Sequence, residues 1–182
     1  MEKFVEPWEY YVFDDFFHDR DLALIKDILY FFPKCTTEGE RCRVPIGSAF
    51  SYEDDPAEHT FPELRQFLSN KVKNVLSTYD EFADLHKKKV FVEYQSLGKN
   101  FEWEIHKDTP SKFFSLVLYL EPEHGSCGTR IYDGKEFVRE VEWKQNRAVA
   151  FYNKAHHLHD FYSNVDKRIT LNFVFLQNGI NP

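Results

Sequence analysis

Trp103-Glu104-Ile105-His106-Lys107-Asp108 is the stretch around which we expect the rest of the chain to be organised. Side chains on an extended segment alternate between two sides, so His106 and Asp108 point the same way and can reach the same ion. An imidazole and a carboxylate are two of the three ligands in the facial triad of two histidines and one carboxylate, which binds ferrous iron and leaves coordination positions open. The stretch therefore predicts a metal site that needs one more histidine.

The second half of the chain offers both that histidine and an anion-binding group. A short pattern such as His-x-Asp often arises by chance, so the prediction depends on these downstream residues. The candidate ligands lie in His156-His157-Leu158-His159. Arg168 follows, and its planar guanidinium can hold the carboxylate of an organic acid through two parallel hydrogen bonds.

The last predicted strand, residues 168–176, has one polar and one apolar face. Arg168, Thr170 and Asn172 share the polar face, because side chains alternate along a strand. Two interpretations are open at this point. In the first, the polar face lies inside a β-sandwich, where burying the arginine is costly unless it meets an acid. In the second, the polar face is the solvated outside of the sheet.

The composition favours one globular domain over residues 1–182. With 182 residues, 42% of them hydrophobic, the chain can bury a sizeable core without disulfide or metal staples. A net charge of −7 disfavours nucleic acid as a partner, because a phosphate backbone attracts basic surfaces. Three cysteines without a Cys-x-x-Cys pair indicate reduced thiols. The absence of a leader pattern or a long apolar run in the sequence predicts a cytoplasmic protein without a membrane partner.

Hydrophobic periodicity predicts two helices followed by about eight short strands. The first helix follows a strand at 10–13 and is expected to be capped by Asp19 or Asp21, and a capping box at Thr60 opens the second. Residues 34–59 between them are expected to form a long loop, a candidate lid or substrate-contact segment. This order suggests a β-sandwich or open barrel with helices on one outer face. The later strands are predicted at 90–94, 101–108, 113–120, 130–132, 137–141, 147–151, 157–162 and 168–176.

These features together resemble the iron(II)- and 2-oxoglutarate-dependent dioxygenases, particularly their small prolyl-hydroxylase-like branch. The resemblance is carried by His106-x-Asp108, a distal histidine and Arg168-x-Thr170, in that order. It implies a mainly β fold with flanking helices, a double-stranded β-helix (jelly roll, cupin-like) with the N-terminal helices packed on one sheet. Further matching segments are Val12-Phe13-Asp14-Asp15-Phe16-Phe17, Leu118-Tyr119-Leu120, Gly128-Thr129-Arg130 and Asn146-Arg147-Ala148-Val149-Ala150-Phe151.

The resemblance implies that the catalytic metal is iron(II), held by the His-x-Asp pair and a distal histidine. The distal ligand in that family typically lies nine or ten positions before the carboxylate-binding arginine, and His159 lies nine before Arg168. His157 would face the same way on a strand and is the alternative ligand. His156 is the least favoured of the three.

The resemblance also implies a cofactor-binding set. Arg168 would bind the remote carboxylate of 2-oxoglutarate, and Thr170 would add a hydroxyl. Tyr119 and Tyr94 look like the tyrosines that some relatives use for that carboxylate, although each is equally well explained as aromatic core.

The activity implied is hydroxylation of a substrate C–H bond, coupled to the conversion of 2-oxoglutarate and O2 to succinate, with ascorbate as a possible stimulant of turnover. A prolyl or other protein residue is the leading substrate, and Arg130 and Trp103 are candidate substrate contacts. The alternatives are a hydroxylase of small molecules or free amino acids, a catalytically inactive metal- or ligand-binding β-sandwich, and a cupin-like enzyme that does not use 2-oxoglutarate. Nucleic-acid demethylation is disfavoured because Val174 stands where that branch has a second arginine, and halogenation because Asp108 supplies a carboxylate.

Overall fold

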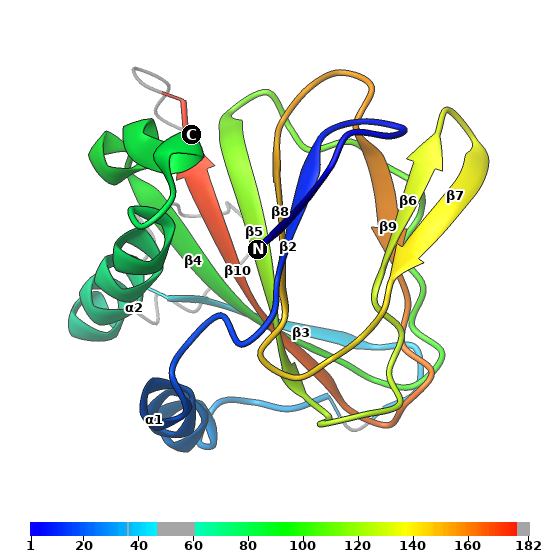
Figure 1. Ribbon diagram of the computed structural model, residues 1–182. Helices are drawn as coiled ribbons and strands as arrows, with labels where there is room; N and C mark the ends of the chain where they lie inside the picture. Colours follow the sequence, from blue (N-terminus) through cyan, green and yellow to red (C-terminus); the bar gives the residue numbers. More distant parts are fainter. Residues whose placement is uncertain (36, 47–60, 178–182) are drawn as a thin grey trace.

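Two antiparallel sheets lie against each other in the computed structural model, which describes residues 1–35, 37–46 and 61–177 (Figure 1). The larger sheet has seven strands in the order β1-β2-β8-β5-β10-β4-β3, and the smaller sheet has three in the order β7-β6-β9. Such a mainly β architecture agrees with the predicted sandwich. The strands are β1 (Glu2–Phe4), β2 (Tyr10–Phe13), β3 (Arg41–Ile46), β4 (Val90–Leu97), β5 (Lys112–Glu121), β6 (Thr129–Asp133), β7 (Glu136–Val141), β8 (Ala148–Tyr152), β9 (Leu158–Phe161) and β10 (Arg168–Leu176).

The helices cover the face of the larger sheet that is turned away from the smaller sheet (Figure 1). They are α1 (Asp19–Leu29), α2 (Pro62–Leu76) and the 3-10 helix η1 (Asp80–Lys87). Ile25 of α1 and Leu68 of α2 are fully buried in a core cluster that also contains Leu171 of β10. The N-terminal helices therefore pack on one sheet, as predicted.

A second core cluster fills part of the space between the two sheets. Alternation along the central strands divides their side chains between the two clusters. In β2, Tyr11 and Phe13 pack on the helix side, whereas Tyr10 and Val12 pack toward the smaller sheet. The jelly-roll interior is thus lined by every second residue of each strand.

The polar face of β10 lies inside the sandwich. Ile169 and Leu171 belong to the helix-side core, so Arg168 and Thr170 point to the opposite face, where they are only 1% and 0% exposed. Of the two interpretations left open by the sequence, the inner one is therefore correct, and a charged guanidinium is buried between the sheets.

Two expectations about elements are wrong. Residues 101–108 form no regular strand, since only Glu102 and His106 make isolated bridges, to Tyr162 and His159. Within the predicted loop at 34–59, residues Arg41–Ile46 form strand β3, which pairs with β4 at the edge of the larger sheet. The loop prediction failed because these six residues are rich in arginine and proline, and only their pairing with β4 makes them a strand.

The helix caps also differ from the prediction. His18 occupies the N-cap of α1, and Asp19 is the first helical residue, where a negative charge still favours the helix dipole. Asp21 instead pairs with Lys71 of α2 at 2.7 Å. Phe61 is the N-cap of α2, and the predicted cap at Thr60 falls outside the described residues.

None of the helices in the described part of the chain is both long and apolar enough to cross a membrane.

Candidate metal centre and anion site

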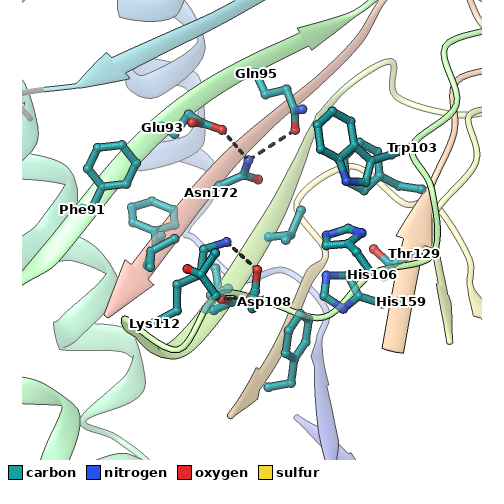
Figure 2. Close-up of a pocket in the computed structure, with 18 of the residues that line it drawn as sticks. Phe91, Glu93, Gln95, Trp103, His106, Asp108, Lys112, Thr129, His159 and Asn172 are labelled. Carbon is teal, nitrogen blue, oxygen red and sulfur yellow. Dashed lines mark hydrogen bonds and ion pairs between the residues drawn. The ribbon is translucent and has the colours of Figure 1, made fainter. Parts of the chain in front are cut away.

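His106, Asp108 and His159 meet between the two sheets. One ligand atom from each residue lies within 4.8 Å of the others, and the two imidazole centroids are 4.5 Å apart (Figure 2). The backbone explains how residues so distant in sequence come together. The amides of His106 and His159 each donate to the other's carbonyl, both at 3.0 Å, so the loop after β4 and strand β9 present both rings to one point.

Each ligand group is held by its own neighbours. Nδ1 of His106 donates to the carbonyl of Glu104 at 2.8 Å, which leaves Nε2 of that ring with its lone pair. The Asp108 carboxylate accepts hydrogen bonds from the Lys112 ammonium and the Ser115 hydroxyl. Such surrounding partners orient metal ligands and fix their protonation.

The protonation states favour a metal ion. Burial lowers the pKa of His106 and lowers that of His159 to about 4, so both rings are neutral near pH 7. Burial acts to raise the pKa of Asp108, but the charge and hydrogen bond of Lys112, with further help from His159 and Ser115, bring it below its usual value. Two neutral imidazoles and one carboxylate are the donor set that ferrous iron takes in a facial triad.

His157, the alternative ligand, points away from this cluster. Its ring stacks on Trp8 at a centroid distance of 4.4 Å, and its Nδ1 donates to the carbonyl of Tyr152 at 2.6 Å. It does not share the metal-facing side with His159 because the regular strand begins only at Leu158. His156 packs edge-on against His157 and also lies outside the cluster.

Arg168 is buried and has no acidic partner among the described residues. Its Nε donates to the carbonyl of Cys127 at 3.1 Å, but its Nη2 has no hydrogen-bond partner among the described residues. The rings of Tyr119, Trp143 and Phe161 surround the guanidinium with centroids 4.9–5.8 Å away. Burial lowers the pKa of Arg168 to about 10, yet the group stays charged at neutral pH. An ionised group in such a place is costly unless an anion joins it.

Tyr119 lies beside Arg168. It is fully buried, its ring stacks on Trp143, and its hydroxyl donates to Thr129 Oγ1 at 2.7 Å. Thr129 lines the cavity and was not singled out from the sequence. The signal was available, because Thr129 stands in the matched segment Gly128-Thr129-Arg130 and faces opposite to its neighbour Arg130.

The other predicted residues are dispersed. Trp103 lines the cavity near His106, with ring centroids 6.0 Å apart. Thr170 is buried on the inner face but contacts Gln95, at 3.4 Å, and does not line the cavity.

Two predicted site residues point away from the cavity. Tyr94 lies in the helix-side core, where its ring meets Phe32, because it alternates with the inward-facing residues of β4. Arg130 lies on the outer face of the smaller sheet and pairs with Asp160. The structure therefore removes Tyr94 and Arg130 from the candidate contacts.

A cavity of about 800 Å³ connects the metal cluster to Arg168. One wall is a polar network on β3, β4 and β10 that the sequence did not reveal (Figure 2). Glu93, only 4% exposed, pairs with Arg43 at 2.8 Å and accepts a hydrogen bond from Asn172 at 3.3 Å. The available signal was the spacing of Glu93 and Gln95, two polar residues two positions apart in a strand that is apolar apart from these and Ser96.

The residues present fit both groups that the sequence predicted. Nδ1 of His159 is buried without a hydrogen-bond partner among the described residues, and so is Nη2 of Arg168. Buried polar atoms are rarely left unsatisfied in a native protein, so both positions are suited to binding an additional group. The cluster would accept a divalent metal ion, and Arg168 would accept a carboxylate.

The fold and this site define the chain as a double-stranded β-helix protein with a two-histidine, one-aspartate cluster beside a buried arginine, which confirms the predicted fold class. No protein-family model and no curated protein matches the sequence.

Solved structures do share the fold. A 2-oxoglutarate–iron(II) oxygenase family oxidoreductase from Burkholderia pseudomallei superposes with a TM-score of 0.68 at 14% identity, covering 94% of this chain and 86% of that one. A prolyl hydroxylase from Trichoplax adhaerens, solved with a hypoxia inducible factor peptide fragment, gives 0.64 at 12% identity over 92% and 83%. A Pseudomonas putida prolyl-4-hydroxylase gives 0.59 at 14% identity over 93% of each chain.

Proposed function

We propose that this protein is an iron(II)- and 2-oxoglutarate-dependent dioxygenase that hydroxylates a C–H bond of its substrate. The observation that carries the proposal is Arg168, a buried guanidinium with no acid partner in the described residues, which lines the same cavity as the His106–Asp108–His159 cluster. A metal cluster alone would suit many enzymes. A metal cluster and an unneutralised arginine in one cavity suit a dicarboxylate that binds both.

Each residue then has a defined task. His106, Asp108 and His159 would hold the iron, and Arg168 would anchor the remote carboxylate of 2-oxoglutarate. The bound iron and 2-oxoglutarate supply the oxidation of the substrate by O2. Tyr119 holds Thr129 and packs beside Arg168, and the aromatic surround excludes water from that ion pair, which strengthens it.

Lys112 and Ser115 serve the aspartate. Each donates to a different oxygen of Asp108, so they fix the rotation of the carboxylate and keep it ionised. Lys112 also lines the cavity, where its ammonium adds positive charge beside the metal position.

The leading substrate is a prolyl or other protein residue. Support comes from the prolyl hydroxylases that share this fold, one of them solved with a peptide. A small molecule or free amino acid is the alternative, and the polar wall around Glu93 suits either class because it offers both charges and an amide. Trp103, next to His106, is the proposed substrate contact.

The cofactor assignment is tested by anaerobic titration of the metal-free protein with iron(II) and then 2-oxoglutarate, following the weak visible charge-transfer band of the chelate. We expect Arg168→Gln to bind 2-oxoglutarate about 10- to 150-fold more weakly, as loss of a charge-assisted contact worth about 1.5–3 kcal/mol requires. Metal affinity should be unchanged in this variant. Iron binding without the band would favour the cupin-like alternative, and no binding of either would favour a non-catalytic sandwich.

The substrate assignment is tested separately by succinate production. Proline-containing peptides are expected to raise it above the uncoupled background. If free amino acids or other small molecules do so and peptides do not, the peptidyl proposal is abandoned while the cofactor assignment stands.

A further inference from the structure

Two cysteines lie side by side near the edge of the cavity. The Sγ atoms of Cys35 and Cys42 are 2.7 Å apart, although the residues are seven positions apart in the chain. Both are free thiols. Their separation is only about 0.7 Å longer than the ~2.05 Å bond of a disulfide, so little movement is needed to join them.

The backbone holds both cysteines against the end of β4. The amide of Cys35 donates to the Ser96 hydroxyl at 3.1 Å, and Cys42 is the register partner of Ser96 in the β3–β4 ladder. Thr37, which lies between the two cysteines in the chain, is packed closely there, since a Cβ added to Gly98 would lie 2.0 Å from its carbonyl oxygen. The proximity of the two thiols is therefore built into the fold.

We propose that Cys35 and Cys42 are a modification site that forms a reversible disulfide under oxidising conditions. Cys42 stands between Arg41 and Arg43 on β3, and both arginines line the cavity. The disulfide would tie this edge strand to the segment that precedes it. It would thereby fix the part of the cavity wall that these arginines supply, whatever reaction the cavity serves.

The chemistry needs a two-electron oxidant, and a peroxide is sufficient. The Cys42 thiolate attacks one oxygen of hydrogen peroxide, so its sulfur becomes a sulfenic acid and the other oxygen leaves as hydroxide, which is protonated to water. The Cys35 sulfur then attacks the Cys42 sulfur, the S–O bond breaks, and the Cys35 proton leaves with the hydroxyl as a second water. Overall, two thiols lose two electrons and two protons, and one peroxide becomes two waters.

The two positions have different accessibility, which sets the order of these steps. Cys35 is 3% exposed, whereas Cys42 is partly exposed and can meet the oxidant. Burial, and to a smaller degree the neighbouring Cys42, raise the pKa of Cys35 to about 12, so Cys35 stays a thiol until the sulfenic acid forms beside it. The third cysteine, Cys127, is 4% exposed and has its own place beside Arg168, which makes it the internal control.

The test is oxidation of the folded, full-length protein with hydrogen peroxide in the presence of EDTA, which keeps iron chemistry out. Unreacted thiols are then alkylated after denaturation and the protein is digested with trypsin. Cleavage after Lys34, Arg41 and Arg43 separates the cysteines into peptides 35–41 and 42–43. A disulfide therefore gives one joined mass, two hydrogens lighter than the sum of the peptides, that divides on reduction.

We expect the joined mass in the wild-type protein and in Cys127→Ser, with peptide 113–130 of the wild type recovered as an alkylated thiol. Dithiothreitol should restore three alkylatable cysteines. In Cys35→Ser the joined mass should be absent and Cys42 should accumulate as sulfenic acid, which a dimedone probe detects. The proposal is overturned if the wild-type peptides carry only alkylated thiols or higher oxides, or if Cys127 reacts before the pair does.

Discussion

At the scale of single residues, two histidines two positions apart have different roles. His159 belongs to the metal cluster, whereas His157 stacks on Trp8 and lies outside the cluster. Both are buried and both have a pKa near 4, so burial and charge alone do not separate them. Only the direction in which each side chain points separates them, and that direction depends on the residue at which strand β9 begins.

His159→Ala is therefore expected to abolish tight metal binding, while the matched His157→Ala should retain it. Changes to residues that only support a metal ligand cost roughly 10- to 100-fold in affinity, and loss of a ligand should exceed that range. Titration with cobalt(II), followed by its visible absorption, measures both, with circular dichroism as the check on folding. The ligand assignment is reversed if His157→Ala is the variant that loses the metal.

Gly128 lies where the backbone leaves no space for a side chain. A Cβ there would lie 1.7 Å from the carbonyl oxygen of Val141, and its amide donates to Glu140 at 2.7 Å. No side-chain rotation relieves a clash with backbone, so the β6–β7 pair must move.

We expect Gly128→Ala to lower the free energy of unfolding by about 1–3 kcal/mol, the usual cost of overpacking. Because Thr129 follows directly, 2-oxoglutarate affinity should fall as well. Urea unfolding and the charge-transfer titration measure the two effects. A Gly128→Ala variant that unfolds at the same urea concentration as the wild type would contradict the argument from crowding.

At the scale of elements, α2 supports the sheet but lies on the face opposite to the site. Its residues Leu68 and Val72 are fully buried in the helix-side cluster, and neither lines the cavity. A substitution in the buried face of α2 should therefore lower the free energy of unfolding without changing the affinity for the metal.

Leu68→Ala is expected to lower the free energy of unfolding by about 2–5 kcal/mol, the range for a buried leucine. Its metal affinity, measured at denaturant concentrations at which the variant is still folded, should be unchanged. The matched Asn74→Ala, on the exposed face of the same helix, should stay within about 0.5 kcal/mol of wild type. Chemical denaturation gives both values. A metal affinity that falls in proportion to stability would mean that the helix layer does position the site.

At the scale of the whole molecule, stability should depend on pH through buried neutral histidines. The pKa of His157 and of His159 is lowered from 6.5 to about 4, chiefly by burial. Between these values the unfolded chain binds more protons than the folded one, so stability is complete above about pH 6.5 and is lost as pH falls toward 4.

For the metal-free protein we expect each of these histidines to remove about 1 kcal/mol of unfolding free energy between pH 7.5 and 5.5. His157→Gln should reduce the loss by about that amount, since its side chain does not titrate. Urea unfolding at the two pH values measures the change. A wild-type free energy that is flat over this interval would show that the rings are protonated in the folded state as easily as in the unfolded chain.

The sequence by itself determined the parts of this protein that depend on local pattern. Alternation in residues 168–176 separated Arg168 from the apolar face correctly. His106 and Asp108 do lie in one cluster, but not through the strand alternation expected from the sequence, because residues 101–108 form no regular strand. The 3.6-residue period located both α-helices. These signals are local because side-chain direction follows directly from backbone geometry.

Only the tertiary structure decided what depends on partners distant in the chain. Strand β3 exists because β4 offers it an edge, and Tyr94 is core because its face of β4 is covered by helices. The choice between His157 and His159 depends on the pairing of His159 with His106. Such contacts join segments far apart in sequence, and their energies act only once the chain has folded, so no local pattern records them.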